Sequence, residues 1–142
     1  MDKTMVIYWS QTGNTEKMAE AVGEGIKENG SEVSVLNVAD VNPADLEALE
    51  GFALGCPAMG DEVLEEDQME PFVSAVEAFA NGKKIALFGS YGWGDGQWMR
   101  DWEERMKTAG AVLVNDQGLI INEEPDDDGL GECKALGKAL VK

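Results

Sequence analysis

The chain has 142 residues, 44 % of them hydrophobic, which predicts a single domain over residues 1–142 with a core of its own. Acidic residues outnumber basic ones by 28 to 11, and the net charge of −17 excludes nucleic-acid binding through neutralised phosphates. Histidine is absent, so Ser-His-Asp and Cys-His catalysis are excluded and the commonest zinc ligand is missing.

The first predicted element is a strand over 5–9, followed by a short polar loop and an amphipathic helix from Thr15 to Asn29. The loop combines hydroxyl side chains with residues that tolerate unusual backbone angles: Ser10, Gln11, Thr12, Gly13, Asn14 and Thr15. Because free backbone N–H groups gather at a helix N-terminus, this order favours a bound anion. We interpret the loop as a phosphate cradle; the alternative is an ordinary turn in which Thr12 or Asn14 caps the helix. Neither G-x-x-x-x-G-K-[ST] nor G-x-G-x-x-G occurs, which argues against a Mg-nucleotide hydrolase and a dinucleotide-binding fold.

Further along the chain, apolar runs alternate with amphipathic segments. The predicted strands lie at 33–38, 52–56, 85–89 and 111–114, and the last resumes at 119–121. The predicted helices are a short one capped by Asn42, one over 67–80, one that carries Trp98, Trp102 and Met106 and ends at Gly110, and a last one behind an acidic start at 126–128. Five strands that alternate with helices predict an α/β fold, a three-layer doubly wound sandwich around a five-stranded parallel sheet.

Ligands of such sheets bind beyond the carboxyl ends of the strands, where three predicted loops meet. These loops cover 10–15, 57–62 and 90–96. The second exposes Met59 and the third exposes Tyr91 and Trp93, which is costly unless something flat and apolar covers them. An isoalloxazine ring between Met59 and Trp93 meets that requirement. The alternative is that these side chains simply pack on the domain.

Three segments carry a family resemblance. The loop 10–15 has the form Ser/Thr-x-Thr-Gly-Asn-Thr, and Ala58–Glu62 and Leu87–Gly96 follow it in order. Together they resemble the flavin loops of flavodoxins, in particular the short-chain clostridial ones. The resemblance covers essentially the whole chain. It implies the strand order 2-1-3-4-5, bound FMN, and an electron-transfer protein rather than an enzyme.

The resemblance also implies roles for individual residues. The first loop and Ser90 would hold the FMN phosphate, and the ring would lie between Met59 and Trp93. The Gly60 carbonyl would accept a hydrogen bond from N5–H of the reduced ring, presented by a four-residue turn in which Gly60 has a positive φ. Glu62 would reach the N3 and O4 edge of the ring. The full set of expected cofactor-binding residues is Ser10, Gln11, Thr12, Gly13, Asn14, Thr15, Ala58, Met59, Gly60, Asp61, Glu62, Ser90, Tyr91, Gly92, Trp93, Gly94 and Asp95.

The expected function is one-electron transport by this flavoprotein at low potential. A ring that gains negative charge would lie in a protein of charge −17, near Glu62 and Asp95. The acidic surface favours redox partner proteins with basic surfaces, unless it serves solubility alone. An FMN-dependent quinone reductase of the same fold is the alternative. A phosphoacceptor signalling domain is disfavoured, because Trp9–Ser10 and Cys56–Pro57 stand where it needs acidic residues.

The cysteines and the remaining segments are not expected to take part in the flavin site. Cys56 and Cys133 stand in apolar surroundings and are expected to be free, buried thiols. No run resembles a signal peptide or a transmembrane segment, so we expect a cytoplasmic monomer that binds no membrane. No metal site is expected, and no flavin role is expected for 122–125.

Overall fold

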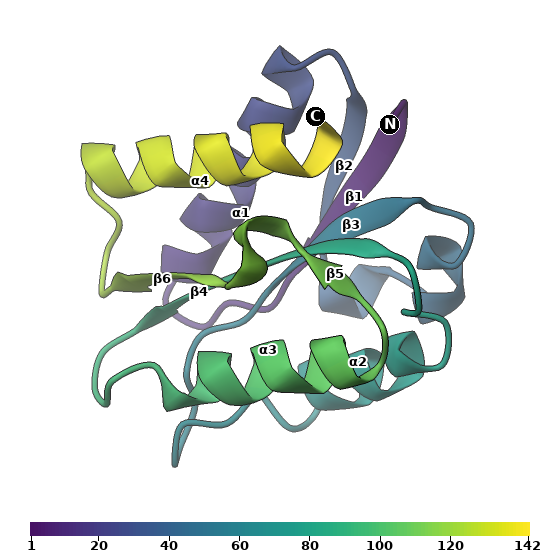
Figure 1. Cartoon of the computed structure of the whole chain (residues 1–142). Helices are drawn as coiled ribbons and strands as arrows, with labels where there is room; N and C mark the ends of the chain where they lie inside the picture. The colour runs from purple at the N-terminus through teal and green to yellow at the C-terminus, as the bar shows by residue number, and fades with distance from the viewer.

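The computed structural model describes all residues, 1–142, and Figure 1 shows a sheet between two layers of helices. The strands and helices, in chain order, are β1 Lys3–Tyr8, α1 Asn14–Glu28, β2 Glu32–Asn37, η1 Val38–Asp40, η2 Pro43–Leu46, β3 Gly51–Gly55, α2 Met69–Glu77, β4 Lys84–Tyr91, α3 Gln97–Thr108, β5 Val112–Leu113, η3 Val114–Asp116, β6 Leu119–Asn122 and α4 Asp127–Val141. This alternation confirms the predicted α/β class.

The sheet is parallel, with the order β2-β1-β3-β4-β5. β5 and β6 both pair with the same side of β4. β5 pairs with residues 84–85 of β4, and β6 pairs with residues 88–91 further along the strand. The fifth position is therefore shared by two short strands, as the interrupted run at 111–121 predicted. Asn115 and Asp116 make the break between them, with φ of 60° and 61°.

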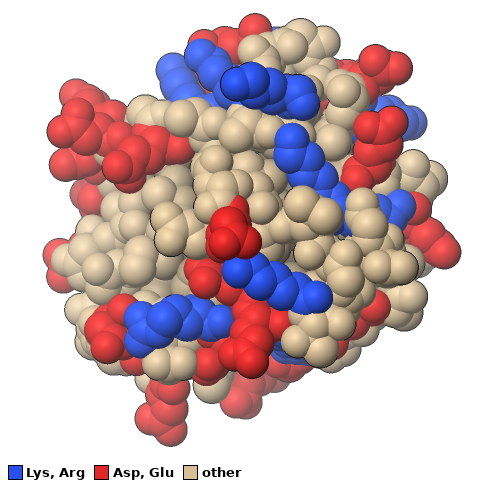
Figure 2. All heavy atoms as spheres, in the orientation of Figure 1, with Lys and Arg blue, Asp and Glu red and all other residues tan.

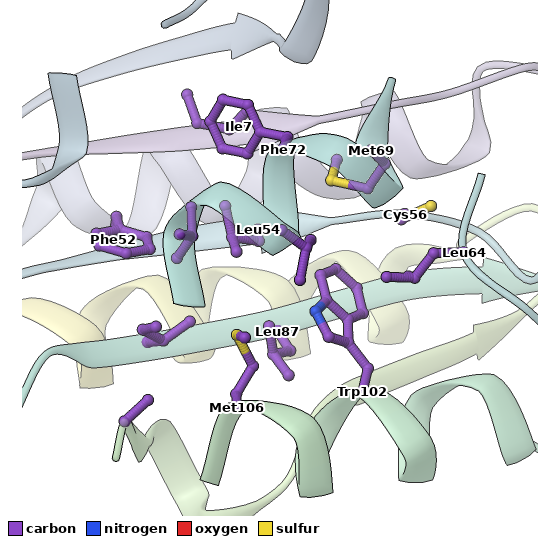
Figure 3. Packing of buried hydrophobic residues seen from close by; sticks show 14 of the residues in the cluster. Ile7, Phe52, Leu54, Cys56, Leu64, Met69, Phe72, Leu87, Trp102 and Met106 are labelled. Carbon is purple, nitrogen blue, oxygen red and sulfur yellow. The ribbon is translucent and has the colours of Figure 1, made fainter. Parts of the chain in front are cut away.

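Each face of the sheet has its own core, because α1 and α4 cover one face while α2 and α3 cover the other (Figure 1). On the second face, Trp102 and Met106 of α3 point at Leu87 of β4, and α2 adds Met69 and Phe72 (Figure 3). These side chains are at most 4 % exposed. The two cores hold the sheet rigid beneath its carboxyl edge.

Most predicted bounds differ from the structure by a few residues, and three of the differences stand out. β4 runs on through Ser90 and Tyr91, which were expected in a loop, because β6 continues the pairing to Ile121 and Asn122. The helix expected over 67–80 begins at Met69 and ends at Glu77. The short helix after Asn42, expected to carry Leu49 and to be closed by Gly51, ends at Leu46. Asn42 caps it as predicted by accepting the Ala44 N–H at 3.0 Å.

Two further sequence features are confirmed. Cys56 and Cys133 are free and buried, and burial raises the pKa of each thiol to about 12. Asp126 caps α4 by accepting the Gly129 N–H at 2.8 Å, in keeping with the acidic start expected there. None of the helices has the length and apolar character that crossing a bilayer would require.

Candidate functional site

A hollow of about 180 Å³ opens at the carboxyl edge of the sheet, between the ends of β1, β3 and β4. It is lined by Ser10, Gln11, Thr12, Asn14, Thr15, Pro57, Ala58, Met59, Ser90, Tyr91, Gly92, Trp93 and Glu123. All three predicted loops therefore meet in one place. Strand order reverses between β1 and β3, the point at which open α/β sheets bind their ligands. A larger hollow, of about 490 Å³, lies at the opposite edge beside Lys83, Lys84 and Lys142, but it lacks an aromatic wall.

The expected residues that do not line the hollow lie close around it. Gly13 is the N-cap of α1, with φ 97°. Gly60, Asp61 and Glu62 form the tip of the loop after β3. Gly94 and Asp95 continue the loop after β4, where Asp95 pairs with Arg100 at 2.8 Å.

The loop after β1 is closed by its own serine. Ser10 Oγ accepts hydrogen bonds from the backbone N–H groups of Gly13, at 3.1 Å, and Glu16, at 3.3 Å. The alternative N-caps Thr12 and Asn14 are both wrong, because Gly13 takes that position and has no side chain to cap the helix. The amides at the start of α1 thus converge on a single oxygen, and a phosphate would find its donors already gathered.

A pair of buried hydroxyls joins the first loop to the end of β4. Thr15 Oγ1 and Ser90 Oγ lie 3.0 Å apart, and the two residues are 1 % and 5 % exposed. Both were expected to donate to the phosphate. A hydroxyl can accept and donate at once, so the pair can keep its mutual bond while one of its hydrogens is offered to the hollow.

The loop after β3 is a tight antiparallel turn. Met59 and Val63 exchange both backbone hydrogen bonds, each at 2.9 Å, and both Gly60 and Glu62 have a positive φ, of 48° and 57°. The expected positive φ at Gly60 is confirmed, whereas the expected four-residue turn is wrong: it closes at Val63 and has one residue more. The Gly60 carbonyl accepts the indole N–H of Trp93 at 3.2 Å.

The aromatic residues of the third segment have different environments. Trp93 is 56 % exposed and stands at the mouth of the hollow. Tyr91 is half-buried and packs against Trp98 with ring centroids 5.8 Å apart. Trp93 is therefore the large apolar group that a flat ligand would cover.

The side chain of Glu62, expected at the ring edge, contacts α3. Its Oε1 accepts the backbone N–H groups of Gly96 and Gln97, at 3.1 and 3.0 Å. The carboxylate therefore joins the second loop to the third.

Sequence reasoning missed Glu123, which lines the hollow although no role was expected for 122–125. Its φ is 58°, and its N–H donates to the Tyr91 carbonyl at 2.7 Å. This left-handed conformation turns the chain back over the end of β4. The residue type gave no signal for it, since glutamate rarely adopts such angles.

No lysine or arginine lines the hollow. Lys17, in the first turn of α1, is paired with Glu124, whose pKa it lowers. Arg100 is paired with Asp95, which raises the pKa of its guanidinium. Figure 2 shows acidic groups prominent along the left rim of the molecule, on the side where the strands end in Figure 1. A negative ligand here would be held by amides and hydroxyls rather than by cations.

The donor set suits a phosphate monoester joined to a flat apolar ring. Converging amides and hydroxyls lie at one end of the hollow, and Met59, Tyr91 and Trp93 lie at the other. Gly92 has nothing within 4 Å of the position that a Cβ would take, so its backbone is open to a ligand. These features fit FMN.

The chain is similar to known proteins over almost its whole length. The chain matches the family model for flavodoxin over residues 6–137. It is 53 % identical to a flavodoxin of Clostridium beijerinckii over 136 residues, which is 96 % of this chain and 97 % of that protein. A flavodoxin of Megasphaera elsdenii is 43 % identical over 137 residues, again 96 % of this chain and 97 % of the relative. The solution structure of two-electron reduced M. elsdenii flavodoxin matches with a TM-score of 0.87 at 42 % identity, over 96 % of this chain and 97 % of that one.

Proposed function

Because the chain belongs to the flavodoxin family, whose members bind FMN and carry electrons, we propose that it is a low-potential one-electron carrier between redox proteins. It would act as a single FMN-binding domain over residues 1–142. The observation that carries the proposal is the hollow in which the phosphate loop, Met59 and Trp93 meet. The hollow lies where the strand order of the sheet reverses. Open α/β sheets as a rule bind their ligands at that point, and flavodoxins themselves are a standard example of this rule.

FMN, when bound, supplies the redox chemistry, and the protein positions and tunes it. The amides at the start of α1, with Ser10 and Thr12, would bind the phosphate without a cation. Met59 and Trp93 would shield the two faces of the ring from water. The Gly60 carbonyl would accept a hydrogen bond from a ring N–H once its bond to the Trp93 indole is released.

The low potential would follow from charge. Glu123 lines the hollow, and Asp61, Glu62 and Asp95 belong to the two loops that provide Met59 and Trp93, in a chain of net charge −17. Of these, Asp95 is neutralised by a side-chain ion pair, with Arg100. The remaining carboxylates would repel negative charge on the ring, and apolar walls strengthen that repulsion. The second electron would therefore enter only at low potential.

The exposed edge at Trp93 would be the place of electron transfer. Partners with basic surfaces would be drawn to it by the acidic rim. The rival function, an FMN-dependent quinone reductase, needs room for a substrate above the ring. Trp93, at the mouth of the hollow, occupies one side of that space.

The proposal is tested by reconstitution. The purified protein should bind one FMN and bind riboflavin much more weakly, and a potentiometric titration should resolve two one-electron steps with the second at low potential. Turnover of a quinone by a reduced nicotinamide without a separate reductase would favour the rival. Failure to bind FMN would overturn both.

A further inference from the structure

Helix α3 is capped by a side chain from another loop. It begins at Gln97 behind Gly96, which has a φ of 96° and no side chain to offer. The acceptor for its first amides is Glu62 Oε1, which lies 3.1 Å from the Gly96 N and 3.0 Å from the Gln97 N. A carboxylate at this end of a helix gains both hydrogen bonds and the favourable field of the helix dipole.

The loop before α3 leaves space for this carboxylate at Gly94, and we call this space the seat. A Cβ added at Gly94 would lie 2.4 Å from Glu62 Cδ and 2.6 Å from Oε1. Only glycine at this position leaves room for the Glu62 side chain. Glu62 itself has a φ of 57°, a conformation that costs energy for a residue with a Cβ. The positive φ of Glu62 and the missing Cβ of Gly94 thus both allow the Glu62 carboxylate to reach the start of α3.

We propose that Glu62 is a positioning residue that fastens the turn 59–63 to the loop 93–97, so that the two walls of the ring site move as one body. The Trp93 indole adds a second link across the same gap by donating to the Gly60 carbonyl. Met59 and Trp93, which would face the ring, belong to the two parts that Glu62 joins. The role toward the ring rests on the proposed function, but the fastening is a property of the protein alone.

Glu65 supplies a matched control. Its carboxylate accepts the backbone N–H groups of Asp67, Gln68 and Met69 at 2.6 to 2.9 Å and so caps α2, the next helix along the chain. The two glutamates use the same chemistry, but the bonds of Glu65 are local and join no second loop. Removing Glu65 should weaken α2 and leave the link between the two walls intact.

The first test is amide hydrogen exchange in the FMN-free protein. Glu62→Ala should raise the exchange rates of the Gly96 and Gln97 amides about fivefold relative to core amides of β4, the factor for a lost helix cap of ordinary strength. Glu62→Gln, which keeps an acceptor oxygen, should give a smaller rise. Glu65→Ala should raise the exchange rates at 67–69 instead. Unchanged rates at Gly96 and Gln97 in Glu62→Ala would overturn the proposal.

A double-mutant cycle tests the seat. Gly94→Ala should displace the carboxylate and so raise the same two exchange rates while Glu62 is still present. In the Glu62→Ala background the clash no longer exists and only the strain of an alanine at a φ of 79° remains, so Gly94→Ala should raise the two rates by a smaller factor than it does when Glu62 is present. Additive effects of the two substitutions would show that Gly94 is no seat for Glu62 and would overturn this part.

Two readouts separate positioning from mere helix stability. The indole N–H resonance of Trp93 should move in Glu62→Ala, while those of Trp98 and Trp102 in the core should not. FMN and riboflavin should lose affinity by the same factor, since the phosphate loop is untouched, and Gly94→Ala should reproduce this loss. Unchanged affinities in both variants would overturn the role toward the ring. If the unaltered protein bound no FMN, the proposed function would fail. The exchange data would still show whether Glu62 joins the turn 59–63 to the loop 93–97.

Discussion

Gly60 combines an open position with a backbone conformation that a side chain would strain. Its φ is 48°, yet nothing lies within 4 Å of the position of an added Cβ. The cost of Gly60→Ala is therefore conformational, about 1–2 kcal/mol. If that cost falls on the reduced state, whose N5–H needs the carbonyl, a loss of about 1.4 kcal/mol lowers the first reduction potential by about 60 mV.

The measurement is a spectroelectrochemical titration of Gly60→Ala, with FMN affinity determined alongside in the oxidised state, which should change little. Gly30→Ala is the matched control, because Gly30 also has a positive φ, of 90°, and open space, and it lies far from the site. It should lower stability without moving either potential. Equal weakening of all redox states by Gly60→Ala would mean that the carbonyl has no special role.

Thr15 carries a second prediction at this scale, because its hydroxyl serves both the link to Ser90 and the phosphate cradle. Thr15→Val keeps the shape and removes the hydroxyl. We expect FMN affinity to fall by about 1–2 kcal/mol, the size of one charge-assisted hydrogen bond, and riboflavin affinity to change much less. Thr4→Val is the control, since Thr4 is equally buried but bonds to the Gly51 carbonyl at the other end of β1. Equal losses of affinity for FMN and riboflavin in Thr15→Val would mean that the Thr15 hydroxyl bonds to Ser90 but does not contribute to phosphate binding.

At the scale of elements, α2 depends on a buried acid. Glu65 is 7 % exposed, and its carboxylate accepts three backbone N–H groups at the start of the helix. Glu65→Ala should lower the free energy of unfolding by about 2 kcal/mol, the upper end for a helix cap, and Glu65→Gln by less. Urea unfolding of the FMN-free protein measures both. Glu66→Ala, at the exposed neighbour, should change little, and similar losses at the two positions would rule out the cap.

Helices α2 and α3 are also joined by Arg105, which bonds to Glu70 and to Glu77. The hydrogen bond from Arg105 lowers the pKa of Glu70, so the folded state favours its carboxylate. Its contribution to stability is therefore present above the ordinary pKa of 4.5 and is lost as the pH falls through the lower value of the folded state.

We accordingly expect Glu70→Gln to lower the free energy of unfolding by about 0.5–1 kcal/mol at neutral pH, since the pair is partly exposed, and by progressively less below pH 4.5. Urea unfolding across this pH range gives the comparison. Glu66→Gln makes the same change of charge with no ion pair. A Glu70→Gln deficit that stayed constant down to strong acid would speak against the ion pair as its source.

The elements show which features could be predicted from the sequence. The alternation of strands and helices, the interrupted fifth strand and the three site loops follow from local patterns of apolar runs and turn residues, whereas the strand order was implied by the family resemblance. The roles of Glu62 and Glu65 could not be predicted, since each depends on which amides tertiary folding brings within reach. Glu123 was missed for a similar reason: its place in the site requires a positive φ that its residue type does not announce.

At the scale of the whole molecule, charge is the dominant feature. The chain carries −17; Glu123 lines the hollow with the exposed Trp93, and Asp61 follows Gly60, whose carbonyl bonds to the Trp93 indole. If the exposed edge at Trp93 is the docking face, reduction of a small basic haem protein should be fast at low salt. Raising the ionic strength from about 0.01 to 0.15 M shortens the Debye length from about 30 to 8 Å and should slow the reaction tenfold or more.

Stopped-flow kinetics over this salt range test the idea, with an uncharged quinone as the control oxidant, whose rate should not depend on salt. Asp61→Asn and Glu123→Gln should flatten the salt dependence for the haem protein. Glu20→Gln, on the exposed side of α1, removes the same charge away from the hollow and should leave the dependence almost unchanged. Because net charge is equal in these variants, a difference between them can only reflect where the charge lies. Equal dependence of the rate on ionic strength in all variants would mean that the acidic surface acts through its total charge. A rate that did not depend on salt would mean that the acidic surface serves only solubility.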